Sequence, residues 1–157
     1  VFVGHGRTFF DFNEDTSAQL GVSYASGPNG FGERAQVFGA DYTMKWQPGT
    51  KGKSWILEAE AYGVDPGSGA DDKFGAFAAF TFEFKPRLFA TVKADYSEIP
   101  LTSDLHSAIS LGITYKSSEF SHIRFEYQRV SSNFEADKNL LTFQLQYLIG
   151  THPAHKY

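Results

Sequence analysis

Residues 38–46 read Phe-Gly-Ala-Asp-Tyr-Thr-Met-Lys-Trp, and this stretch decides the fold class. Apolar or aromatic side chains stand at every second position from Phe38 to Trp46, and Asp41 and Lys45 lie between them. Side chains two residues apart share one face of a β-strand. The spacing therefore predicts a strand with one apolar and one polar face, and it does not fit a helix.

The same alternation recurs along the whole chain. Further strands are predicted at 18–24, 55–61, 74–84, 88–96, 105–115, 123–128 and 141–147, and residues 1–12 read more weakly as another. Short turns are predicted at 13–16, 47–52, 85–86 and 116–119, and longer loops rich in Gly, Pro, Asp, Asn and Ser at 26–33, 64–72, 97–103 and 131–139. Because short and long connections alternate, each class falls at one end of an antiparallel up-and-down meander, and residues 1–157 form a single domain.

Composition excludes several classes of protein. The 157 residues contain no Cys, so thiol catalysis, thiolate metal sites and disulfides are excluded. No run approaches the 18 uninterrupted apolar residues that a membrane helix requires. The formal net charge of -4, without a Lys/Arg block, argues against a nucleic-acid partner. The aromatic content of 17% instead favours strands.

Two all-β architectures share this alternation, a soluble barrel with its apolar side inward around a ligand and a membrane barrel with its apolar side outward. The positions of aromatic residues on the apolar face favour the membrane barrel over the soluble one. They stand beside short turns at Trp46, Trp55 and Tyr115 and beside long loops at Tyr96 and Tyr127, with Ala, Leu, Val and Ile between. Such paired belts are expected at the two membrane interfaces.

The opposite face carries too many charges for the interior of a small soluble barrel, but it suits a polar lumen. The lumen-facing charged residues are predicted to be Asp41, Lys45, Glu58, Glu60, Lys93, Asp95, Arg124 and Glu126, joined in cross-strand ion pairs. The predicted fold is thus an all-β, transmembrane, antiparallel up-and-down β-barrel. The count of eight or nine strands, set against the even number in bacterial barrels, predicts that the chain is the C-terminal part of a larger barrel.

Three phrases resemble a known family: FGADYTMKWQPGTKGKSWILEAEAYG at 38–63, ITYKSSEFSHIRFEYQRVSSN at 113–133 and LTFQLQYLIGTHPAHKY at 141–157. They are similar to the C-terminal half of a bacterial outer-membrane β-barrel family labelled TonB-dependent-receptor-like or zinc-regulated outer membrane protein. The resemblance implies the bacterial outer membrane as location, with the lipid bilayer, lipopolysaccharide and the barrel assembly machinery as partners. By resemblance to outer-membrane barrels generally, Phe143, Tyr147 and Tyr157 form the assembly signal of the closing strand.

No catalytic constellation is identified, so the protein is not expected to be an enzyme. Glu58 and Glu60 share a face as an acid/base pair would, but charge neutralisation across strands is the simpler explanation. His152 and His155 are weak metal candidates, because two ligands do not make a zinc site. No metal or other cofactor is expected. The predicted function is a passive channel or uptake protein for small solutes. The alternative is a structural or interaction barrel with a closed lumen that anchors or binds a partner.

Overall fold

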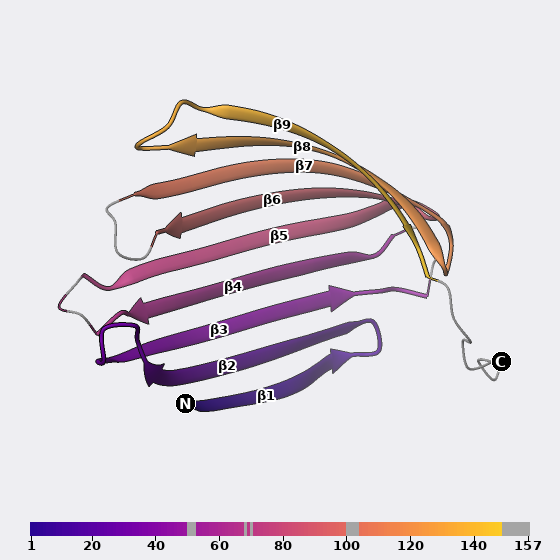
Figure 1. The fold of residues 1–157 in the computed structure, drawn as a ribbon. Coiled ribbons are helices and arrows are strands. Elements are labelled where there is room, and N and C mark those ends of the chain that lie inside the picture. Colours follow the sequence, from indigo (N-terminus) through magenta and orange to yellow (C-terminus); the bar gives the residue numbers. More distant parts are fainter. Residues whose placement is uncertain (50–52, 68, 70, 100–103, 149–157) are drawn as a thin grey trace.

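The computed structural model describes residues 1–49, 53–67, 69, 71–99 and 104–148, whose strands form a single sheet (Figure 1). The strands are β1 (Phe2–Asn13), β2 (Thr16–Pro28), β3 (Arg34–Trp46), β4 (Trp55–Asp65), β5 (Lys73–Lys85), β6 (Leu88–Glu98), β7 (Leu105–Ser118), β8 (Ser121–Ser132) and β9 (Lys138–Tyr147). Their spatial order is β1 to β9, and each strand is antiparallel to the next. The predicted all-β up-and-down meander is confirmed. In the described residues no helix is long and apolar enough to cross a membrane.

The connections lie alternately at the two ends of the sheet. Those that follow β1, β3, β5 and β7 lie at one end, on the right in Figure 1, which we call the short-turn end. Those that follow β2, β4, β6 and β8 lie at the opposite, long-loop end. This placement agrees with the predicted separation of the two classes of connection.

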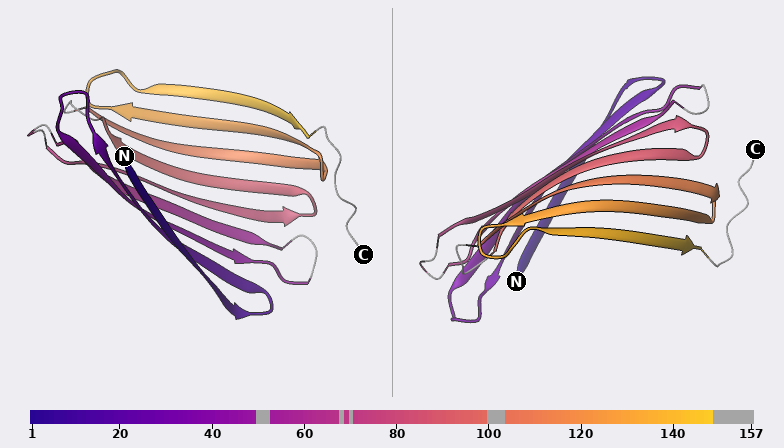
Figure 2. Two further views of the ribbon diagram at one scale, coloured as in Figure 1. Left: turned by 60° about the horizontal axis from the view of Figure 1, so that its bottom comes forward. Right: turned by 90° about the horizontal axis from the view of Figure 1, so that it is seen from above.

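The sheet is twisted and curved into an open trough (Figure 2). β1 and β9 are its two edges, so the strands of the described part of the chain do not close into a barrel. Because neighbouring strands alternate in direction, the odd-numbered β1 and β9 run the same way. The strands thus form an open antiparallel meander.

One face of the sheet is apolar, and no strand of the described residues packs on it as a second layer. In that part of the chain, the buried apolar side chains are only those of Ala18, Pro66 and Ala79. Large apolar side chains stay exposed instead, including Ile109 at 60%, Leu141 at 70% and Phe143 at 69%. A water-soluble domain buries such a face against a second layer. This sheet has an apolar surface where a soluble domain has a core.

Candidate functional site

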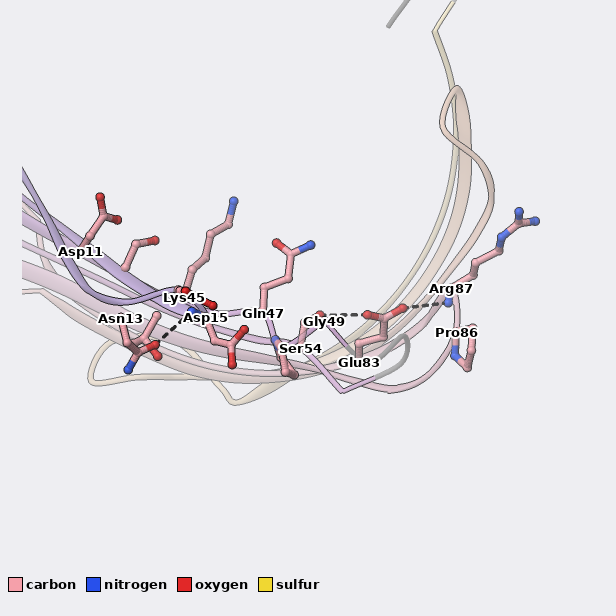
Figure 3. A pocket seen from close by; sticks show the side chains of 14 residues that line it. Asp11, Asn13, Asp15, Lys45, Gln47, Gly49, Ser54, Glu83, Pro86 and Arg87 are labelled. Atoms are coloured by element: carbon pink, nitrogen blue, oxygen red, sulfur yellow. Dashed lines mark hydrogen bonds between the residues drawn. The ribbon is translucent and has the colours of Figure 1, made fainter. Parts of the chain in front are cut away.

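The charged residues predicted for the lumen share one face of the sheet. Figure 3 shows Lys45 and Asp11 rising from the sheet toward the hollow side of its curvature, which we call the concave face. Strand alternation and register then place the remaining residues on this face, since Asp41 pairs with Glu60 across β3 and β4. The full predicted set lies there: Asp41, Lys45, Glu58, Glu60, Lys93, Asp95, Arg124 and Glu126.

Two ion pairs on the concave face join residues of the same strand. Lys93 Nζ lies 2.5 Å from Asp95 Oδ1 within β6, and Arg124 contacts Glu126 within β8. Residues two apart on a strand share a face about 6 to 7 Å apart, so a long cationic side chain reaches its own neighbour. The predicted cross-strand pairing is therefore wrong for these four residues.

A third ion pair does cross strands, and a glycine makes room for it. Arg7 on β1 and Asp41 on β3 are both in register with Gly21 of β2, and Arg7 Nη2 lies 3.9 Å from Asp41 Oδ1. A Cβ atom at Gly21 would stand 2.1 Å from Asp41 Oδ2. The Asp41 carboxylate thus lies over the bare backbone of β2, directed toward Arg7.

Beside this ion pair lies a hollow of about 300 Å³, which we call the Phe77 hollow. Its lining on the concave face is Arg7, Gln19, Asp41, Thr43, Glu58, Glu60 and Phe77. Phe77 is half-buried on β5, opposite Glu60 of β4 on one side and Asp95 of β6 on the other. Lys93 Nζ stands 5.2 Å from the centre of the Phe77 ring. Glu58 and Glu60 are exposed and have no ion pair among the described residues.

A larger hollow of about 680 Å³ lies at the short-turn end (Figure 3). Glu83 accepts hydrogen bonds from Ser54 Oγ at 2.9 Å and from the Arg87 amide at 3.0 Å. These bonds hold the β5–β6 turn, where Arg87 has a φ of 68°, a value that non-glycine residues rarely adopt. The side chains of Asp11, Lys45 and Gln47 extend into this hollow from the neighbouring strands (Figure 3).

The predicted interface aromatics lie on the opposite, convex face. Trp46 and Trp55 are directly opposite one another on β3 and β4, and their rings stack with centres 6.4 Å apart. These two and Tyr115 lie at the short-turn end, Tyr96 lies near the long-loop end, and Tyr127 stands near the middle of β8. Exposed rings of Phe80, Phe125 and Phe143 also lie on this face between its ends. The role of the five residues at a membrane interface stays a prediction.

Only two of the residues predicted for the C-terminal assembly signal or for metal binding lie in the described part of the chain. Phe143 and Tyr147 lie on the convex face of β9, whereas Tyr157, His152 and His155 lie outside the described residues. Within the described ranges, no group of three or more His, Cys, Asp or Glu side chains could hold a metal ion.

Sequence reasoning missed Arg7, Gly21 and Phe77 as neighbours of the charged residues. Arg7 sits in the weakly alternating first segment, and Phe77 is an apolar residue at a polar position, so neither follows the pattern used. A usable signal was Gly21 at a position of the second strand that shares the concave face, because such a glycine allows close approach by a neighbouring side chain.

No family model, curated protein or solved structure matches this chain. The family resemblance seen in the sequence therefore stays a prediction, and so does the location that it implies.

Proposed function

We propose that this sheet is part of the wall of a bacterial outer-membrane β-barrel that acts as a passive channel or uptake protein for small solutes. The observation that carries the proposal is the division between its two faces. Exposed apolar and aromatic side chains cover the convex face, and the ion pairs and unpaired carboxylates lie on the concave face.

Lipid and water are the two solvents that suit these faces. Moving apolar surface out of water is favourable by about 25 cal/mol per Å². An uncovered apolar face is therefore more stable in contact with lipid acyl chains than in contact with water. Charged groups have the opposite preference and favour a hydrated lumen. Trp46, Trp55 and Tyr115 near one end of the strands, and Tyr96 near the other, fit the headgroup regions on either side of the hydrocarbon.

The ion pairs of the concave face support a solute path. Lys93–Asp95 and Arg124–Glu126 each lie along a single strand and do not extend to another wall. Charges paired in this way are neutralised at the wall and leave the space above it open. A lumen closed by salt bridges would need pairs that reach across it.

Closure into a barrel would restrict the number of further strands. β1 and β9 run in the same direction, so closure with antiparallel neighbours only takes an odd number of further strands between them. The total is then even, as in bacterial outer-membrane barrels.

Folding into lipid vesicles tests the membrane assignment. Phe125→Lys places a charge at the middle of the convex face of β8, and Gln128→Lys places the same charge on the concave face of that strand. We expect Phe125→Lys to lower folding stability in phosphatidylcholine vesicles by about 2 to 4 kcal/mol and Gln128→Lys to have little effect. Equal effects of the two variants would contradict the assignment of the faces.

Conductance in planar bilayers tests the channel. We expect folded protein to give stepwise ionic currents. Protein that folds into vesicles but stays electrically silent would refute the channel and favour the closed-lumen structural barrel.

A further inference from the structure

The two carboxylates beside Phe77 differ in whether a cation is paired with them. Asp95 on β6 and Glu60 on β4 are both directly opposite Phe77, so the ring lies between two carboxylates. On the β6 side, the Lys93 ammonium binds Asp95 and stands 5.2 Å from the ring centre. On the β4 side, the Phe77 hollow lies beside Glu60, and no ammonium of the described residues pairs with that carboxylate.

The cations near the hollow do not neutralise its glutamates. Arg7 is directed to Asp41, which reaches it across Gly21. Lys45 is in register with Ile56, which shares the concave face of β4 with Glu58. It forms no ion pair among the described residues. Glu58 and Glu60 therefore leave two uncompensated negative charges beside an aromatic ring.

We propose that the Phe77 hollow binds a small organic cation, a primary or quaternary ammonium on a short carbon chain, as a solute of the proposed channel. The ammonium takes the position beside Glu58 and Glu60 that Lys93 takes beside Asp95, and the carbon chain packs on Phe77. Lys93 serves as an internal example of this arrangement, because it already joins an ammonium, a carboxylate and this ring. Attraction of a cation to a ring face adds to the attraction of the carboxylates.

Other ligands fit the hollow less well. A metal ion needs more ligands than these two carboxylates supply, and no group of three or more His, Cys, Asp or Glu side chains among the described residues could hold one. A neutral sugar would find the donors Arg7 and Gln19, but it would leave the two negative charges uncompensated. An organic cation satisfies the charge and the ring together.

Titration of the full chain in detergent micelles tests the inference. The probes are n-butylammonium chloride, choline chloride and glucose, and the readout is the NMR shift of the backbone amides around Phe77, which are present in every variant. We expect saturable shifts with the two cations and none with glucose. Glu58→Gln with Glu60→Gln should weaken cation binding at least about tenfold, which is about 1.4 kcal/mol. Phe77→Leu should weaken it about threefold or more.

A matched control removes the same number of charges elsewhere. Asp11→Asn with Glu14→Gln acts at the short-turn end, outside the Phe77 hollow, and should leave binding unchanged. Since Glu58 and Glu60 are exposed, their replacement removes no buried contact, and an unchanged circular dichroism spectrum checks folding. The inference fails if no probe saturates, if glucose alone binds, or if both double variants weaken cation binding equally.

This experiment separates the inference from the function on which it builds. Protein that conducts ions but binds neither cation overturns the site and leaves the channel standing. Protein that binds the cations but is silent in planar bilayers overturns the channel and leaves the site standing.

Discussion

The side-chain amide nitrogen of Asn29 donates a hydrogen bond of 2.8 Å to the carbonyl oxygen of Pro66, which joins the β2–β3 loop to the connection after β4. The amide oxygen of Asn29 also accepts hydrogen bonds from the backbone N–H groups of Phe31 and Glu33, each at 2.9 Å. One side chain thus orders its own loop and attaches it to the next.

Substitution of Asn29 separates these two roles. Asn29→Ala removes all three hydrogen bonds, so we expect faster amide hydrogen exchange at Phe31 and Glu33 and faster proteolysis of the loop. Asn29→Asp keeps the acceptor oxygen and loses the donor. It should protect the two amides while the contact with Pro66 is lost. Unchanged exchange in Asn29→Ala would show that the loop is ordered by other contacts.

The missing side chain of Gly75 on β5 makes room for the ring of Tyr62 on β4, which lies over it. A Cβ atom at Gly75 would stand 2.4 Å from the Tyr62 ring. We expect Gly75→Ala to destabilise the fold by about 1 to 3 kcal/mol through overpacking, measured by urea unfolding in micelles or vesicles. Adding Tyr62→Ala should remove much of this penalty. Additive effects of the two substitutions would mean that the ring moves aside freely.

Trp46 and Trp55 are the only tryptophans in the chain, so fluorescence reports directly on the short-turn end of the convex face. We expect lipids brominated near the headgroup to quench this fluorescence more than lipids brominated at the end of the acyl chain. Trp46→Phe and Trp55→Phe each leave one reporter, and both should give the same depth. Absence of quenching by any brominated lipid would contradict an interfacial belt.

Acid should release the β8–β9 loop from the sheet. A hydrogen bond from Arg129 and a second from Ser131 lower the pKa of Asp137 below its ordinary value of 3.8. A carboxyl group with a lowered pKa stabilises the folded state above its unfolded pKa and loses this effect as the pH falls through its folded pKa. The attachment of the loop should therefore persist at neutral pH, begin to weaken below about pH 3.8 and be lost as the pH falls through the lower pKa of the folded state.

The pKa of Asp137 can be followed by NMR titration of its carboxyl carbon. Arg129→Gln should raise this pKa toward its ordinary value. Lys138→Gln is the matched control, because Lys138 lowers the pKa of Glu135 in the same loop and should leave that of Asp137 nearly unchanged. The explanation is wrong if Lys138→Gln raises the pKa of Asp137 as much as Arg129→Gln does.

Strands β2 to β9 were predictable from the sequence because their side chains alternate between two environments, whereas β1 alternates only weakly and was the least clear of the nine. Their ends were less predictable. β3 was expected from Phe38 and begins at Arg34, and β8 was expected to end at Gln128 and continues to Ser132. These extensions lie at the long-loop end, where the alternation of polarity is reversed while backbone pairing continues. Polar Arg34, Gln36 and Arg129 share the convex face there, and apolar Ala35, Val37 and Val130 share the concave face.

The pairing of charges could not be read from alternation. Alternation gives the face of Lys93 and Arg124, but the choice between a partner on the same strand and one on a neighbouring strand depends on side-chain rotamers and on register. Arg7 and Asp41 meet only because Gly21 stands between them in both registers. That coincidence involves three strands, and no single stretch of sequence contains it.

The shared direction of β1 and β9 restricts how two copies of this sheet could join edge to edge. Copies standing side by side with the same orientation in a membrane would have to pair β1 with β9 in parallel, which is slightly less stable per residue. An antiparallel β1–β1 or β9–β9 junction would turn one copy upside down, so that its long-loop end would lie at the short-turn end of the other copy. The shared direction of the two edge strands thus disfavours antiparallel pairing between equally oriented copies, the hazard that open edges otherwise create.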